Sequence, residues 1–378
     1  MSTNRNILNV RLTLWFLAMG SVVALYIACG TQMPATDSQD PAGTLGVPGP
    51  PGAMGLPGPM GAPGADGDIR VYGNGSAGSK IVSADEDWQN TPPTNLMFTD
   101  FTVNAGVTLN IPSGTVIRCT GSFTNHGTIQ VFLAGAGGGN PGGTPPGMIQ
   151  PAIALPDPGI SRRAPEVAEL GDDSQFRRGS AGGAGILSLQ GRFLLHPGIK
   201  AGGGGMGTFA NGGGDGGCSF TVLAKTAVVN SETGTINADA FGGAEGSGGG
   251  GGGIIILASK ETVTNNGALS AKGGDGGPSN AETGPGGGGG GGIINLLAPV
   301  INQGAGATTV VTGGLAGEAI ANSVTTTPRW GGGGGGACRG KGGNGGHVDA
   351  GGTVTPRDAQ DGGPGEVYTN LLNPSPLF

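Results

Sequence analysis

Apolar and polar residues alternate along residues 101–111 and 115–131, and Gly or Asn interrupts the alternation every few positions. A period of two predicts short strands, and the interruptions predict tight turns between them. Further along, apolar clusters that can form strands occur at 185–189, 218–224, 254–258 and 293–298. The pattern therefore predicts an all-β chain.

A second pattern precedes these apolar clusters and recurs along the chain. A Gly-containing turn followed by alternating polar and apolar residues occurs at 125–131, 232–238 and 265–271, and more loosely at 196–201. A Gly-dominated stretch follows each, and then an apolar strand. The strands begin at Ile186, Cys218, Ile254 and Ile293, with spacings of 32, 36 and 39, and a further unit is expected near Ala337. Repeats of this length indicate a β-helix-like solenoid whose core comes from stacking, with insertions in the Gly stretches on one side.

Three uninterrupted Gly runs occupy residues 248–253, 286–292 and 331–336. Ordering each Gly costs about 1–2 kcal/mol of backbone entropy, and no side chain is buried in return. The runs are therefore either loops or backbone-paired layers of polyglycine II type, in which each hydrogen bond contributes about 1 kcal/mol. Because they recur at the same point of successive repeats, we favour paired layers.

Residues 43–69 form nine unbroken triplets with Gly at the first position and at no other. The period has a steric cause, since three chains wound around one axis leave no room there for a side chain. The segment resembles the stalks of bacterial collagen-like surface proteins, which implies a triple-helical homotrimer; a monomeric extended linker is the alternative. The stalk glycines are Gly43, Gly46, Gly49, Gly52, Gly55, Gly58, Gly61, Gly64 and Gly67.

The beginning of the chain predicts export. Residues 1–11 carry two Arg and no acid, and an apolar run follows at 12–28, which is a signal-peptide layout. Ala28 directly before Cys29 resembles the bacterial lipobox, which implies lipidation of Cys29 and an outer-membrane or cell-surface lipoprotein of the cell envelope. An uncleaved membrane anchor and plain secretion are the alternatives, and all three export the remainder.

These features divide the chain into six parts. They are a signal peptide (1–28), a lipidated tether (29–42), the collagen-like stalk (43–69), a β-rich cap (70–134), a Gly/Pro-rich insertion (135–184) and glycine-rich solenoid repeats (185–378). The sequence over roughly 72–131 resembles the amino-terminal cap of glycine-rich repeat proteins of bacterial surfaces and phage tail fibres. The resemblance implies a β-helix-like body presented on a fibre.

Composition and charge exclude several classes. With 87 Gly and 27 Pro among 378 residues, an all-helical domain is excluded. Without residues 1–28, 16 basic residues remain against 25 acidic ones, and no basic stripe forms, so we expect no nucleic-acid partner. Cys119, Cys218 and Cys338 follow Cys29, and they allow at most one disulfide, whose pairing the sequence leaves open.

Candidate chemistry is scarce. Residues 335–342 fit most of a phosphate-binding loop, but Gly342 replaces its Ser or Thr. The Asp-bearing loops at 213–218 and 273–278 and the related loop at 342–349 lack the spacing of calcium-binding repeats, and we interpret them as turns. His126, His196 and His347 lie beside Gly or Pro and are also interpreted as turn residues. We therefore expect no catalytic residue, no cofactor and no metal site.

The sequence thus predicts a non-enzymatic, lipid-anchored surface protein with a structural or adhesive role. Its head would present the Gly-side insertions and Trp330 to a surface or glycan ligand. One alternative is a solenoid enzyme that degrades polysaccharides, for which Asp85, Glu86 and Asp87 beside Trp88 are the nearest candidates. The other is an ice-binding protein, although regular Thr ladders are few.

Overall fold

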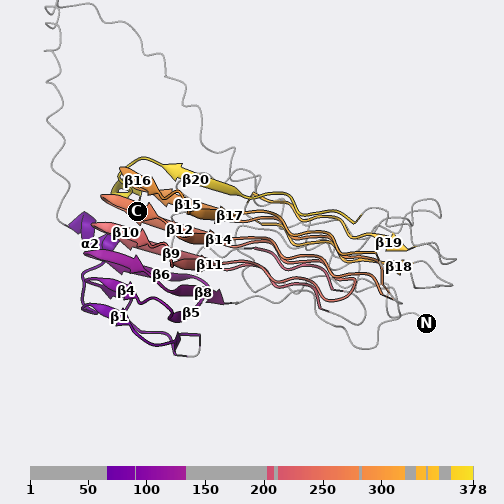
Figure 1. Ribbon diagram of the computed structural model, residues 1–378, viewed down its shortest axis with the longest axis horizontal. Coiled ribbons are helices and arrows are strands. Elements are labelled where there is room, and N and C mark those ends of the chain that lie inside the picture. The colour runs from indigo at the N-terminus through magenta and orange to yellow at the C-terminus, as the bar shows by residue number, and fades with distance from the viewer. Residues whose placement is uncertain are drawn as a thin grey trace, which may run out of the picture. The chain divides into compact units, whose positions relative to one another are not determined.

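The computed structural model describes residues 66–89, 91–132, 202–207, 212–280, 283–319, 329–337, 339–348 and 359–377. They belong to one compact unit, residues 61–378 (Figure 1). The described residues are mostly β and form three parallel six-stranded sheets, a two-stranded antiparallel sheet and two short helices, α2 (Asp66–Tyr72) and η2 (Ser375–Leu377). The prediction of an all-β, solenoid-like fold is confirmed for this unit.

The chain visits the three parallel sheets in turn, so each circuit adds a strand to each sheet. The first sheet contains β1 (Lys80–Val82), β4 (Phe101–Val103), β7 (Ser122–Asn125), β10 (Ala227–Asn230), β13 (Thr262–Asn265) and β16 (Val300–Gln303). The second contains β2 (Glu86–Asp87), β5 (Thr108–Pro112), β8 (Thr128–Phe132), β11 (Thr235–Asn237), β14 (Ala268–Ser270) and β17 (Thr308–Val310). The third contains β3 (Met97–Phe98), β6 (Thr115–Cys119), β9 (Ser219–Ala224), β12 (Ile254–Ser259), β15 (Ile293–Leu297) and β20 (Glu366–Asn370). The stacked circuits form a three-sided β-helix.

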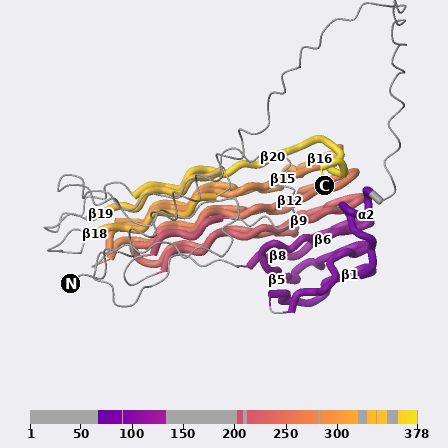
Figure 2. Tube along the Cα trace, turned by 180° about the vertical axis from the view of Figure 1, so that it is seen from behind, coloured from indigo at the N-terminus to yellow at the C-terminus, as the bar shows by residue number. Residues whose placement is uncertain are grey.

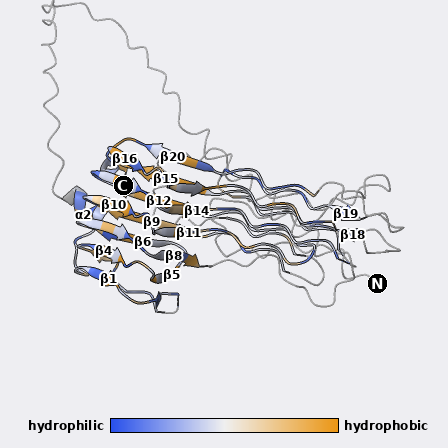
Figure 3. Cartoon of the chain, in the orientation of Figure 1, coloured by the Kyte–Doolittle hydropathy of each residue, from blue (hydrophilic) through white to orange (hydrophobic). Residues whose placement is uncertain are grey.

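The core lies inside this β-helix and is built from side chains in register. Ile236 of β11 lies between Ile129 of β8 and Leu269 of β14, as the recurring turn pattern predicts. Phe101 and Phe123 stack with ring centroids 5.5 Å apart. Strands of the first two sheets mostly bury alternate residues, whereas every residue of β12 and β15 is buried. The third sheet is therefore covered on both faces at β12 and β15. Figure 3 colours the strands by hydropathy and shows hydrophobic stretches along the β-helix.

Helix α2 packs against the outer face of the third sheet. Its Val71 and Tyr72 are buried there, and Asp68 pairs with Lys225 and Lys260, at 3.3 and 2.8 Å between Nζ and Oδ2. The helix ends at Gly73, which has φ of +77° and donates to the carbonyl of Ile69. The prediction that the collagen-like stalk extends over residues 43–69 is therefore wrong for its last triplet. This triplet begins at Gly67 and lies in α2, which the contacts of Asp68, Val71 and Tyr72 hold against the sheet. Gly43 to Gly64 lie outside the described residues.

The repeats differ in part from their prediction. The strands predicted at 254–258 and 293–298 are confirmed, with Ile254 beside Ile293, but the other partner of Ile254 is Ser219 rather than Cys218. β9 pairs directly with β6, so its neighbour comes from the predicted cap, and cap and repeats form one continuous β-helix. Residues 133–201 lie outside the described residues, and they include the segments predicted at 135–184, 185–189 and 196–201. In the third sheet, the strand that follows β15 is β20, which begins at Glu366. The prediction that the next unit begins near Ala337 is therefore wrong.

The later circuits leave the β-helix between the second and third sheets. After β11 the chain runs out along 238–244 and returns along 247–253 into β12. The next circuit uses 271–279 and 283–292, and the last uses 311–319, 331–337, 340–346 and 359–365. Together with 202–206 and 212–217 we call these segments the glycine array. Figures 1 and 2 show the array extending toward β18 (Arg329–Trp330) and β19 (His347–Val348), which confirms that the insertions lie on one side.

Candidate functional site

Segment 247–253 shows how the array is held together. Its amides donate in turn to three neighbouring segments, and each neighbour receives a bond from every third residue. The acceptors are Met206 and Gly203 for Gly248 and Gly251, Gly287 and Gly290 for Gly249 and Gly252, and Phe241 and Ala238 for Gly250 and Gly253, at 2.7–3.1 Å. A repeat of three residues is that of a polyproline II-type helix. The Gly run is therefore ordered by backbone pairing with its neighbours.

Three further segments donate to the carbonyls of the same run. Gly214 donates to Gly248, Gly274 to Gly250 and Gly335 to Gly249, each at 2.8 Å. The run therefore has six hydrogen-bonded neighbours, three that accept from it and three that donate to it. Segment 286–292 is held in the same way. Its amides pair in turn with 271–277, 332–335 and 360–363. The interpretation of the Gly runs as paired layers rather than loops is confirmed.

This packing requires Gly because the backbones lie too close for any side chain. A Cβ atom on Gly289 would overlap the carbonyl oxygen of Gly250, and one on Gly250 would overlap that of Asp215. Gly335, which belongs to the phosphate-loop-like sequence, is one of these paired residues and donates to Gly249. The glycines that make residues 335–342 similar to a phosphate-binding loop are therefore explained by close backbone packing in the array.

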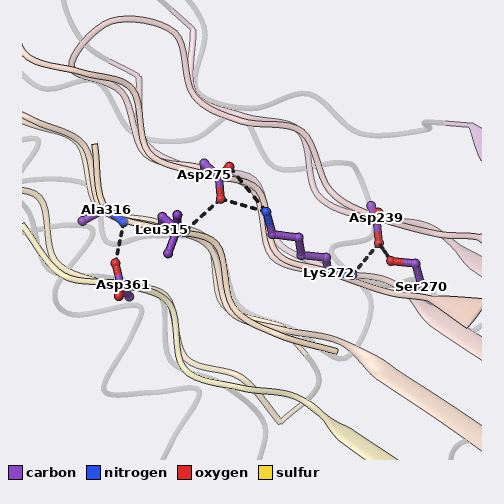
Figure 4. A network of polar contacts seen from close by, with 7 residues as sticks. All are labelled: Asp239, Ser270, Lys272, Asp275, Leu315, Ala316 and Asp361. Atoms are coloured by element: carbon purple, nitrogen blue, oxygen red, sulfur yellow. Dashed lines mark hydrogen bonds and ion pairs between the residues drawn. The ribbon is translucent and has the colours of Figure 1, made fainter. Parts of the chain in front are cut away.

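Carboxylates complete the pairing along one edge of the array (Figure 4). Asp239 accepts bonds from the Ser270 hydroxyl and the Lys272 amide, both at 2.5 Å. Asp275 accepts from the Leu315 amide at 2.8 Å, and Asp361 accepts from the Ala316 amide at 2.7 Å. Asp275 therefore lies in an extended segment and its interpretation as a turn residue is wrong. Within the described ranges no three His, Cys, Asp or Glu side chains gather as metal ligands.

At the far end of the array, side-chain hydrogen bonds and one strand pair link five residues from four segments, which we call the distal cluster: Glu245, Asn280, Arg329, Trp330 and His347. Asn280 donates from Nδ2 to Glu245 Oε2 at 2.8 Å, and its carbonyl accepts from Arg329 Nη1 at 3.5 Å. The Asn280 side chain is itself fixed, because Oδ1 accepts from the amide and hydroxyl of Thr283.

Trp330 and His347 lie opposite each other on the antiparallel strands β18 and β19. Trp330 is half-buried, whereas His347 is fully buried. The interpretation of His347 as a turn residue is therefore wrong, since it is the partner of Trp330 in a strand pair. Trp330 was the member of this cluster that the sequence suggested for ligand contact. Glu245, Asn280 and Arg329 were missed because nothing in their spacing relates them.

The carboxylates near Trp88 are held in local contacts. Glu86 accepts from Lys80 Nζ at 2.6 Å and from Trp88 Nε1 at 2.9 Å, and Asp85 accepts from the Thr108 amide at 2.7 Å. Burial alone would raise the pKa of Glu86, but the bonds from Lys80 and Trp88 hold that pKa below its ordinary value. Trp88 is buried in the core. The Trp88 ring is therefore not exposed as a platform for a sugar ring.

Cys119 and Cys218 are both buried in the hydrophobic core, and the Cys218 thiol donates to the Phe132 carbonyl at 3.2 Å. Burial, with a contribution from the Asp100 charge, raises the pKa of Cys119 to about 12. The Cys119 thiol is therefore protonated and unreactive at neutral pH. Cys29, Cys338 and His196 lie outside the described residues, and His126 lies in the turn between β7 and β8, as predicted. None of the described helices has the length and apolar character to span a membrane.

No family model matches the chain. Searches of the curated proteins and of the solved structures also gave no match.

Proposed function

We propose that the protein is a non-enzymatic, lipid-anchored surface protein that presents the distal cluster to a glycan on an opposing surface. The observation that supports this is the backbone-paired glycine array. Its hydrogen bonds fix several segments against one another and so hold Glu245, Asn280 and Trp330 in a defined arrangement. A preorganised cluster on a scaffold loses little conformational entropy when it binds.

The chemistry of the distal cluster suits a carbohydrate. A half-buried indole offers an apolar face for a sugar ring, and the amide, carboxylate and guanidinium groups beside it can bond to hydroxyls. Glu245 and Arg329 carry opposite charges, so the cluster has no strong preference for a charged ligand. The proposed anchor at Cys29 and the proposed stalk of collagen-like triplets would hold this head away from the membrane.

The test is attachment of cells that display the full chain to glycan-coated surfaces. We expect Trp330→Ala and Arg329→Ala each to lower attachment about tenfold, the order expected for an interface anchor. Phe241→Ala is the matched control, because Phe241 is an exposed aromatic residue of the array outside the distal cluster, and it should attach like the wild type. Antibody labelling must show equal amounts on the cell surface.

Two outcomes would overturn the proposal. One is attachment by both distal variants at the wild-type level. The other is loss of polysaccharide viscosity on incubation with the purified chain, abolished by Asp85→Asn or Glu86→Gln, which would establish the enzyme alternative.

One observation favours the ice-binding alternative. Thr108, Thr128, Thr235 and Thr308 occupy one row of the second sheet, in register and interrupted at Ala268. Stacked strands repeat at about 4.8 Å, so the row is a regular array of hydroxyls. The adjacent row carries Asn110, Gln130, Asn237 and Ser270, and thus lacks a second line of Thr. Inhibition of ice recrystallisation that Thr128→Lys removes would support this alternative.

A further inference from the structure

The direction of α2 shows where the chain enters the β-helix. Asp68, near the start of the helix, pairs with Lys225 and Lys260, which follow β9 and β12. Near the helix end, the carbonyl of Val71 accepts from Arg118 of the earlier strand β6 at 2.8 Å. The helix thus runs from later to earlier strands of the third sheet. Its amino-terminal end points to the side of β15 and β20.

Exposed apolar side chains occur on α2 and on the chain just after β15 and β20, the strands on the side toward which this end points. Ile69 of α2 is 53 % exposed, and Val300, Leu371 and Leu372 are 50, 69 and 37 % exposed. Val300 begins β16 just after β15, and Leu371 and Leu372 directly follow β20. The ends of β15 and β20 are joined by a bond from the Ala298 amide to the Asn370 carbonyl. The following helix η2 contacts the last residue of α2, since Ser375 Oγ and Tyr72 Oη lie 3.0 Å apart. We call these four residues the corner patch. Figure 1 shows α2, β16 and β20 at this end of the unit.

The position of α2 in the sequence indicates what covers the patch. Asp66, its first residue, is two residues after Gly64, so no linker separates the collagen-like triplets from the helix. If three chains wind around one axis, three copies of α2 must begin beside one another. The apolar residues around that point then face the same residues of neighbouring copies.

We propose that the corner patch is the contact by which three copies of this head pack around the threefold axis of the stalk. This inference rests on the proposed triple-helical stalk. It goes further by naming the contact surface, the corner patch, and its partner, a second copy of the same chain. A heterologous contact of this kind closes into a ring when the rotation is threefold. Burial of exposed Ile and Leu side chains supplies its driving force. The charge of Asp68 is compensated within each copy by Lys225 and Lys260.

The test uses the chain from residue 30 onward, which keeps tether, stalk and head. Sedimentation velocity measures its oligomeric state, and circular dichroism follows the triple-helix signal on heating. We expect the wild type to be a trimer. The double variant Ile69→Lys/Leu371→Lys should dissociate at a concentration at least tenfold higher and lose its triple-helix signal at a lower temperature. The matched control is Leu315→Lys, which alters a 61 % exposed Leu of the array and should leave both properties unchanged.

The outcomes separate the two proposals. A trimeric wild type whose double variant has the same dissociation and the same triple-helix melting would overturn the corner patch and leave the stalk intact. A monomeric wild type without a triple-helix signal would overturn the stalk, and the corner patch with it. The unfolding transition of the β-helix, recorded in the same samples, shows that the exposed substitutions have left the head folded.

Discussion

Gly289→Val should unfold the glycine array. Gly289 lies at the centre of a fully paired segment, and its amide donates to the Gly274 carbonyl at 2.8 Å. A Cβ atom there would overlap the carbonyl of Gly250, which is backbone and cannot rotate away. The neighbouring segment must move, and its own bonds break with it. We expect a loss of more than about 3 kcal/mol, at the upper end of overpacking costs.

Urea unfolding and limited proteolysis measure this loss. The variant should be cleaved within residues 238–292 at urea concentrations where the wild type resists. Gly306→Ala is the matched control, because a Cβ atom on Gly306 has no neighbour within 4 Å and its φ is not positive. It should change stability by less than about 1 kcal/mol. Equal stability of Gly289→Val and wild type would show that the array is not packed in solution.

Asn230→Leu should destabilise the β-helix itself. Asn230 is the middle of a buried ladder in the first sheet, where Asn125 donates to it and it donates to Asn265, both at 2.9 Å. The three residues end β7, β10 and β13 and lie in register. Leu has similar volume but removes both bonds, so the buried Asn265 Oδ1 loses this donor and the Asn125 Nδ2 keeps only its 3.2 Å bond to the Thr235 carbonyl. An unsatisfied buried polar group costs about 1–3 kcal/mol, so we expect a loss of about 3 kcal/mol.

The measurement is the urea midpoint followed by circular dichroism. Asn302→Leu is the matched control, since Asn302 lies on the adjacent strand β16 but is exposed. It should shift the midpoint little. A wild-type midpoint for Asn230→Leu would mean that the ladder contributes nothing to stability.

Much of the β-helix could be predicted because its signals are local. The turn-strand pattern at 125–131, 232–238 and 265–271 matches the register of β8, β11 and β14. For the Gly runs the sequence left loops and paired layers open and favoured pairing, because ordering so many glycines costs entropy that only hydrogen bonds can offset. The Asn ladder also has a signal in the sequence, since Asn125, Asn230 and Asn265 each stand just before a turn that contains Gly.

The distal cluster could not be predicted. Glu245, Asn280 and Arg329 come from segments that are 35 and 49 residues apart in sequence. Their contact depends on how many residues of each array segment extend away from the β-helix before the chain turns back, and this number varies between repeats. His347 was misread for the same reason, since its strand partner Trp330 is decided by the pairing of two array segments.

By itself the sequence determined the all-β class, the stacking of repeats and the need for paired Gly runs, because periodicity and backbone entropy act on each segment alone. Only the tertiary structure decided that Gly67 belongs to a helix, that the last circuit extends to Glu366, and which side chains meet at the end of the array. The helix depends on Lys225 and Lys260, which the chain reaches more than 150 residues later. A local Gly-X-Y pattern contains no information about such partners, so contacts that form on folding decide those outcomes.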